Sequence, residues 1–252
     1  MRKRIRLLLS HHGVIAMLVL LGIGIGIVAT HFTWTLLAVI PFGVAAQITN
    51  EYLIHRFVFH LPPPRSQFWF DVLYEAHYGH HDFPSAERLL FVPVWFAVPM
   101  AFINLGVFWG IMALLGVPSP FVHAAALVLV GGVATFIAYE WFHMVSHLPV
   151  KRSWIEQKAA TSHAQHHFRD FTKNYHVTPG GEVVDHMFGT AVSADELREK
   201  SRAEFMTTLG LRPDDPRLLS ARSRIARRMG VGAEAIARQS RVAERMEPKR
   251  VA

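Results

Sequence analysis

Residues 94–141 read VWFAVPMAFINLGVFWGIMALLGVPSPFVHAAALVLVGGVATFIAYEW, and this stretch decides the fold class. It contains one acidic residue, Glu140, and neither lysine nor arginine. Pro118 and Pro120 divide it into two apolar runs, at about residues 94–116 and 121–141. Because about 20 helical residues rise about 30 Å, each run is long enough to cross the hydrocarbon core of a bilayer. The sequence therefore predicts two transmembrane helices joined by a short turn.

A second stretch near the N-terminus predicts another helical pair, at about residues 14–30 and 32–50, turned near His31. Residues 7–55 and 89–150 contain no lysine or arginine, so all 26 basic residues lie outside the two stretches. With four spans, both termini and the middle segment share one side of the membrane, which the positive-inside rule makes cytoplasmic. A cleaved signal peptide over residues 1–30 is the alternative for the first run, although the run exceeds the about 7–15 apolar residues usual for a signal.

The composition favours an integral membrane protein. Hydrophobic residues make up 51% of the chain and charged residues 18%, and the absence of cysteine excludes disulfides and thiolate metal sites. The net charge of +7 comes from basic segments beside the apolar runs, so nucleic-acid binding is not favoured. We expect residues 1–190 to form the membrane-embedded domain. We expect residues 191–252 to form a basic tail of short helices near anionic headgroups, or an arm for a partner, or a partly disordered segment.

Ten of the 16 histidines lie in four clusters that follow the apolar runs. The clusters are His55 and His60, then His77, His80 and His81, then His143 and His147, and finally His163, His166 and His167. Helical residues three or four apart share a face, so each triplet and the third cluster can converge. His55 and His60 are five apart, or about 140° around a helix of 3.6 residues per turn, so we expect the helix to end between them.

Histidines in this number favour a site with two metal ions. Imidazole binds zinc, copper, iron and nickel, but ten histidines over two ions give five each, which leaves one open position at a six-coordinate iron. Glu51 and Glu140 lie four and three residues before His55 and His143, so we expect them to accept the second ring proton of those histidines. For His176 and His186, a role other than metal binding is favoured.

The motif pattern resembles the fatty acid hydroxylase and sterol desaturase superfamily over about residues 51–190. Its signature is a histidine pair followed by two His-x-x-His-His clusters that a long hydrophobic segment separates. The chain is most similar to fatty acid 2-hydroxylases, on four further features. These are Glu51-Tyr52 before His55-Arg56-Phe57, Arg88-Leu89 with Pro93, the extra pair His143 and His147, and Asp185 with Phe188-Gly189-Thr190.

The resemblance implies an all-α integral membrane protein with four transmembrane helices under a cytosolic helical cap, which carries a histidine-rich di-metal site. It implies two iron ions, for which zinc could substitute, held by the ten histidines of the four clusters, with Glu51, Glu140 and Asp185 behind them. It implies O₂ as co-substrate, a lipid acyl chain as substrate, no catalytic side chain beyond the ligands, and a separate electron donor of the cytochrome b5 or ferredoxin type. His176 stands where a small residue is more usual.

Two other functions remain open. Within the superfamily, the chain could be a desaturase or a sterol or carotenoid oxidase, because one oxidant serves these reactions and positioning decides the outcome. A membrane metal transporter is a further alternative, which the expected position of the clusters outside the spans disfavours. A membrane zinc protease is not indicated, since the chain contains no His-Glu-x-x-His.

Overall fold

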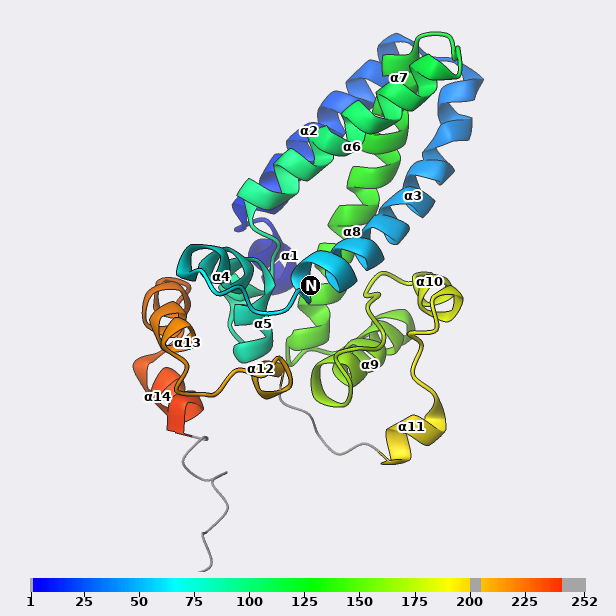
Figure 1. Cartoon of the computed structure of the whole chain (residues 1–252). Coiled ribbons are helices and arrows are strands. Elements are labelled where there is room, and N and C mark those ends of the chain that lie inside the picture. Colours follow the sequence, from blue (N-terminus) through cyan, green and yellow to red (C-terminus); the bar gives the residue numbers. More distant parts are fainter. Residues whose placement is uncertain (1, 200–204, 242–252) are drawn as a thin grey trace, which may run out of the picture.

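The computed structural model describes residues 2–199 and 205–241, and every regular element in these ranges is a helix. Figure 1 shows an elongated bundle of long helices that stands on a wider layer of short helices. The N-terminal helix α1 (Arg2–Leu8) lies at the end of the bundle that meets this layer. The described part of the chain is therefore all-α, as the sequence predicts.

Four helices of the bundle are long and apolar enough to cross a membrane, by length and composition. Their bounds in order are α2 (His12–Thr30), α3 (Trp34–Ile54) with the π-helical turn η1 (His55–Phe59), α6 (Val94–Leu114), and α7 (Pro120–Ala125) continuing through η4 (Ala126–Gly132) into α8 (Val133–His147). Large apolar side chains such as Phe42 and Leu114, 68% and 89% exposed, cover the outside of the bundle, as a lipid-facing surface requires.

The helix ends correct the predicted spans. The second spanning helix runs on through η1 to Phe59, and the fourth runs on to His147. His55, His143 and His147 therefore lie on the last turns of spanning helices, and the prediction that every cluster lies beyond the spans is wrong for these three. The metal-binding candidates consequently adjoin the interior of the bundle.

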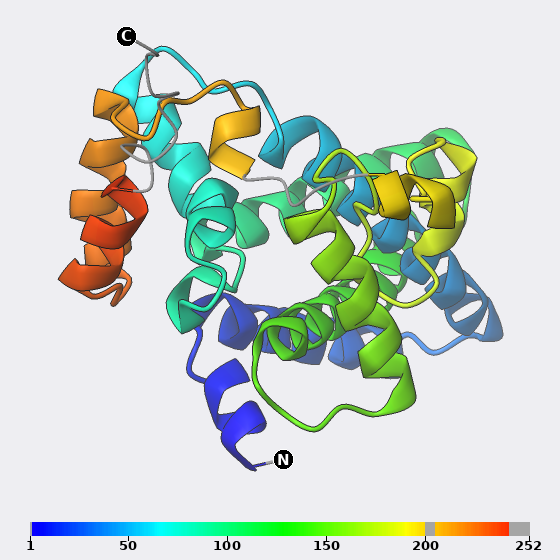
Figure 2. The same cartoon turned by 90° about the horizontal axis from the view of Figure 1, so that it is seen from below.

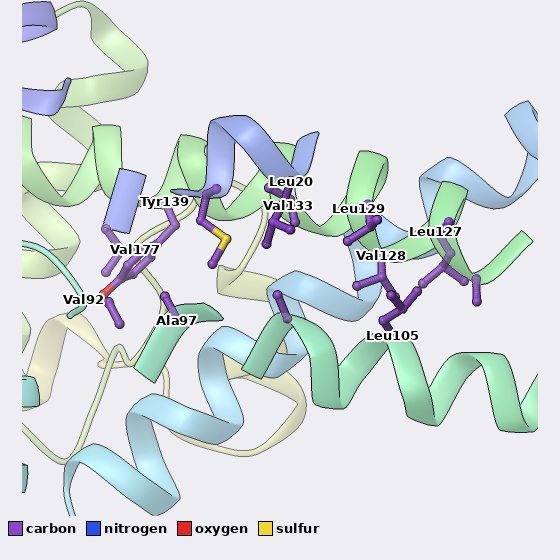
Figure 3. Close-up of a cluster of buried hydrophobic side chains, with 14 of the residues drawn as sticks. Leu20, Val92, Ala97, Leu105, Leu127, Val128, Leu129, Val133, Tyr139 and Val177 are labelled. Carbon is purple, nitrogen blue, oxygen red and sulfur yellow. The ribbon is translucent and has the colours of Figure 1, made fainter. Parts of the chain in front are cut away.

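Small residues let the helices of the bundle approach closely. An added Cβ at Gly43 on α3 would lie 1.9 Å from the carbonyl oxygen of Leu127, and one at Gly131 would lie 2.4 Å from that of Ile40. Close backbone approach at small residues is the usual packing mode of transmembrane helices. Figure 3 shows the apolar side chains inside the bundle, from Val92 and Tyr139 at one end to Leu105 and Leu127 at the other.

The helical layer lies across one end of the bundle (Figures 1 and 2). Its elements are α4 (Gln67–Leu73), η2 (Tyr74–Tyr78), α5 (Gly79–Asp82), the short η3 (Glu87–Leu89), α9 (Trp154–Phe168) and α10 (Glu182–Met187). The start of α9 is fixed by a capping box, in which Ser153 and Glu156 exchange hydrogen bonds.

The tail contributes α11 (Ala194–Glu199), α12 (Phe205–Thr208), α13 (Pro216–Ala221), η5 (Arg222–Ala226) and α14 (Ala233–Arg241). The described part of the tail thus contains short helices, and residues 200–204 and 242–252 lie outside it. Leu218 and Ile225 share a buried core with Phe70 and Tyr74 of the layer. Helix α13 packs against α4 and α12 against α5, while α14 packs against η5. Figure 2 shows α13, in orange, beside the cyan helices, so the described residues 205–241 pack on the helical layer.

Candidate metal centre

Ten histidines meet where the bundle joins the helical layer. They come from η1 and the residue after it, η2, α5, the end of α8, and α9: His55, His60, His77, His80, His81, His143, His147, His163, His166 and His167. The helix ends between the first two, as predicted, since His60 is the C-cap of η1. A π-helical turn pairs residues five apart, and this brings the ring centroids of His55 and His60 to 4.9 Å.

The ten side chains form two groups of five, and within each group the candidate ligand atoms lie within 4.8 Å of one another. The first, here called the His77 group, contains His55, His60, His77, His81 and His166. The second, the His80 group, contains His80, His143, His147, His163 and His167. The expectation that each triplet converges on one point is wrong, because His80 and His166 each join the group opposite to their own cluster.

The nitrogens of each group are too crowded to satisfy one another by hydrogen bonding. The Nε2 atom of His77 lies 3.1 Å from Nε2 of His55, 3.1 Å from that of His60 and 2.9 Å from that of His81. A ring nitrogen of neutral histidine either donates one hydrogen bond or accepts one, so it cannot satisfy three neighbours. A cation at the centre of the group would use all the lone pairs together. The residues present therefore fit one metal ion in each group.

The protonation state of these histidines also favours metal binding. Burial first, and then the charge of neighbouring imidazoles, lowers the pKa of His77, His80 and His163 well below the usual 6.5. The rings are consequently neutral at pH 7, which is the form that offers a lone pair to a metal. Nε2 of His166 is buried and has no hydrogen-bond partner among the described residues, which leaves it available in the same way.

Backbone carbonyls set the orientation of three of these rings. Nδ1 of His55 donates to the carbonyl oxygen of Tyr175 at 2.5 Å, Nδ1 of His143 to that of Leu90 at 2.6 Å, and Nδ1 of His166 to that of Lys173 at 2.8 Å. Each bond places the proton on Nδ1 and directs Nε2 into the group. The prediction that Glu51 and Glu140 accept the ring protons of His55 and His143 is therefore wrong.

The three carboxylates instead hold the backbone that carries two of these carbonyls. Glu51 accepts the N–H groups of Val177 and Thr178 at 2.5 and 3.0 Å, and Glu140 accepts the N–H of Val92 at 3.0 Å. Asp185 accepts the N–H groups of Tyr175 and His176, both at 3.0 Å. Each carboxylate therefore holds a backbone segment whose carbonyl orients a histidine ring, and none of the three bonds a candidate ligand directly.

His176 and His186 lie outside both groups. His176 is buried, and its Nδ1 donates to the carboxylate of Asp185, while His186 is exposed. Burial raises the pKa of Asp185, but the hydrogen bonds from His176 and Thr190 outweigh burial and hold that pKa below its usual value. The structure thus places His176 as a partner of Asp185 and not among the candidate ligands.

The tail supplies two features that sequence reasoning missed. The ring of Phe205 stacks on that of His81, with centroids 4.0 Å apart. Arg222 forms a buried ion pair with Asp82, the residue after His81, and Tyr74 donates a hydrogen bond to the same carboxylate at 2.8 Å. Asp82 and Arg222 are 140 positions apart, so no local spacing in the sequence could have paired them.

An apolar cavity lies inside the bundle and ends at the His77 group. Its volume is about 80 Å³, and Glu51, His55, Phe59 and Tyr139 line the end beside the histidines. Besides Tyr139, five of the side chains that Figure 3 labels also line the cavity: Val92, Ala97, Leu127, Val128 and Val133. A lining of this kind suits a mostly apolar ligand.

Comparison with known proteins agrees with this arrangement. The sequence profile of the family described as fatty acid hydroxylase matches residues 39–190, which include all ten histidines. The fatty acid 2-hydroxylase of Homo sapiens is 34% identical over 122 residues, covering 47% of this chain and 30% of that protein. A dihydroceramide fatty acyl 2-hydroxylase of Arabidopsis thaliana is 28% identical over 166 residues, covering 65% of this chain and 64% of that one.

A solved structure supports the fold. The structure of full-length scs7p, in which only the hydroxylase domain is visible, superposes with a TM-score of 0.58 at 23% identity, covering 72% of this chain and 66% of that chain. The chain spans about a third of the length of the mammalian relatives that it matches. Since the family profile covers more than half of the sequence, the chain belongs to the fatty acid hydroxylase family.

Proposed function

We propose that the protein is a membrane-bound hydroxylase that uses O₂ and two iron ions to hydroxylate an aliphatic carbon of a lipid acyl chain. The observation that carries this proposal is the position of the His77 group, through His55, at the end of a mainly apolar cavity that spanning helices line. An acyl chain that fills the cavity would present one of its carbons at His55. Relatives named as fatty acid 2-hydroxylases support C2 as the carbon attacked.

The two histidine groups would each hold one ion. Five imidazole ligands leave one position open at six-coordinate iron, and zinc could occupy the same nitrogens as a substitute. When bound, the iron pair would supply the activation of O₂ that C–H oxidation needs. Overall, R–H, O₂, two electrons and two protons would give R–OH and water. The electrons would come from a separate donor of the cytochrome b5 or ferredoxin type.

The chain's own residues would hold the histidines and exclude water. The carbonyls of Tyr175, Leu90 and Lys173 fix three rings, so little reorganisation is needed at the moment of reaction. Phe205 covers His81 from the side of the tail, which limits access of bulk water. Glu51, Glu140 and Asp185 would act as positioning residues through the backbone that they hold.

The helical layer would face the cytoplasm. All 26 lysines and arginines lie outside residues 7–55 and 89–150, so the turn that joins each helical pair, at the far end of the bundle, contains none. The positive-inside rule assigns such a basic side to the cytoplasm, and the metal centre and both termini would then lie on that side.

Two alternatives differ in measurable ways. A desaturase or a sterol or carotenoid oxidase would use the same centre with a differently placed substrate carbon, and would form a double bond or another oxidised product. A metal transporter would need a polar path across the bilayer, whereas the cavity is mainly apolar and the histidines gather at one end. Metal flux into vesicles without oxygen-dependent lipid oxidation would favour the transporter.

Lipid profiling tests the proposal. Cells that express the chain should contain hydroxylated acyl lipids that control cells lack, and incorporation of ¹⁸O from labelled O₂ should mark the new hydroxyl. His186→Ala serves as a matched control, because His186 is exposed and outside both groups, and it should retain the product. New double bonds with unchanged hydroxylated lipids would contradict hydroxylation and favour the desaturase.

A further inference from the structure

Three carboxamide side chains line the cavity beyond its histidine end. Gln47 and Asn50 come from α3, and Asn104 comes from α6. None of the three forms a side-chain hydrogen bond with any residue that the structure describes. Polar groups within membrane-spanning helices are unfavourable unless they find a partner, and they mark binding sites for that reason. These amides are therefore available to a polar group on the ligand.

Gln47 and Asn104 lie at a similar depth. Gln47 precedes His55 by eight residues, which is about 12 Å along the helix at 1.5 Å per residue. Asn104 follows Phe96 by the same number of residues, and Phe96 packs against Phe59 at the histidine end, with ring centroids 5.1 Å apart. Asn50 lies nearer to His55, at about 7.5 Å. Gln47 and Asn104 thus form a polar belt partway along the cavity, and Asn50 lies between this belt and the histidine end.

The cavity continues beyond this polar belt into a purely apolar end. Gly43, Leu127 and Phe108 line this end. Each is twelve residues, or about 18 Å along its helix, from a residue at the histidine end: Gly43 from His55, Leu127 from Tyr139 and Phe108 from Phe96. A polar group at that depth would meet no hydrogen-bonding side chain among the described lining residues. The cavity therefore distinguishes positions along a bound chain.

We propose that the cavity selects an acyl chain that carries a hydroxyl or carbonyl oxygen about ten carbons from the carbon attacked; this inference rests on the proposed hydroxylase function. An extended chain advances about 3.5 Å for every three bonds, or about 1.2 Å per bond, so the about 12 Å from His55 to the polar belt corresponds to about ten bonds. If C2 is attacked, the oxygen is at about C12. A plain chain would leave the amides unpaired, and sites built around a hydrogen bond reject analogues that lack it.

The test compares three C18 ligands with the full chain in lipid nanodiscs without reductant. Octadecanoate has no added hydroxyl, 12-hydroxyoctadecanoate places one at the polar belt, and 18-hydroxyoctadecanoate places one at the apolar end. Ligand-induced thermal stabilisation gives the three affinities. We expect 12-hydroxyoctadecanoate to bind at least about tenfold more tightly than either other ligand, which corresponds to about 1.4 kcal/mol.

Variants locate the preference. Gln47→Leu with Asn104→Leu should bring the three affinities within about twofold, since both partners of the hydroxyl are lost. Thr49→Val is the matched control on the same helix: Thr49 is exposed, lies outside the cavity lining and bonds only the carbonyl of Ala45, so the tenfold preference should remain.

Equal affinities in the unmodified protein, or a preference that survives the double variant, would overturn this inference. The binding assay does not depend on turnover, so it separates the inference from the proposed function. If octadecanoate and 12-hydroxyoctadecanoate bind with equal affinity and both are hydroxylated, the result would support the hydroxylase and reject the selective cavity. A clear preference for 12-hydroxyoctadecanoate, with no oxygen insertion after reductant and O₂ are added, would support the cavity and reject the hydroxylase.

Discussion

Replacing Arg222 with methionine should loosen the segment of the metal centre that α5 carries. Arg222 is 2% exposed, and its guanidinium donates two hydrogen bonds of 2.8 Å to the carboxylate of Asp82. In the variant, that carboxylate keeps the hydroxyl of Tyr74, at 2.8 Å, but loses its counter-charge. Asp82 directly follows His80 and His81, which belong to different groups, so both candidate metal positions should be affected.

The magnitude follows from the burial of the pair. Breaking a buried ion pair by removing one partner costs about 3–5 kcal/mol, because the remaining charge stays buried without compensation. At 1.36 kcal/mol per factor of ten, local opening of α5 should increase by about 10²–10⁴-fold. Hydrogen exchange of the α5 amides measures this opening, and iron per chain after exposure to a chelator measures its consequence.

Arg224→Met is the matched control for this prediction. Arg224 lies on the same turn, η5, but its ion pair with Asp71 is at the surface, with the arginine side chain 55% exposed. Such pairs contribute about 0–1 kcal/mol. The double variant Asp82→Asn with Arg222→Met should recover part of the lost local stability of α5, because neither buried charge of the pair remains. Exchange and iron retention equal to those of Arg224→Met would refute the reasoning.

Three further predictions concern other parts of the molecule. His80→Ala and His166→Ala should each abolish product formation while the protein still inserts into the membrane, as activity assays and carbonate extraction would measure; full activity in both would remove the ligand assignment. Gly131→Val should lower the yield of folded protein in detergent, because a Cβ there would lie 2.4 Å from the carbonyl oxygen of Ile40; an unchanged yield would contradict the close packing. Asp185 has a lowered pKa, so its carboxylate stabilises the fold above about pH 4 and loses this contribution as the pH falls. The difference in melting temperature between the unmodified protein and Asp185→Asn should therefore stay constant above about pH 5 and shrink as the pH falls below about 4; a difference that stays constant on further acidification would argue against the carboxylate.

The spanning helices could be predicted from the sequence because the bilayer imposes a local rule. A helix that crosses the membrane must be predominantly apolar, and the absence of lysine and arginine over residues 7–55 and 89–150 records this directly. The helix ends were less accurate, since α8 continues to His147 beyond the predicted residue 141. Its last turns carry His143 and His147, which contact other imidazoles and not lipid, so the helix can extend beyond the apolar run.

The candidate ligands could be identified from the sequence, but their division into two groups could not. Spacing of three and four residues predicts which side chains share a helical face, but it does not reveal which neighbour each side chain meets. His80 turns toward His143, with ring centroids 4.4 Å apart, whereas His77 lies beside His55 at 4.7 Å. The relative placement of α5, α8 and η1 decides this, and it depends on tertiary packing.

The partners of the carboxylates were missed for a related reason. Glu51 and Glu140 were expected to meet histidines one helical turn away, but they reach backbone N–H groups of segments that come from elsewhere in the chain. Almost every residue has a backbone N–H group, so the sequence does not indicate which one a carboxylate will bond. The stacking of Phe205 on His81 is similarly invisible, because a single aromatic residue in a basic tail carries no positional signal.

Metal analysis of the purified protein tests the central claim most directly. Element-specific mass spectrometry should find two iron ions per chain, and X-ray absorption should find a first shell dominated by imidazole nitrogen. His166→Ala should weaken the ion of the His77 group and His163→Ala that of the His80 group, so each variant should retain about one ion per chain under mild chelation. A single ion in the fully active protein, or two firmly held ions in both variants, would contradict the division into two groups of five.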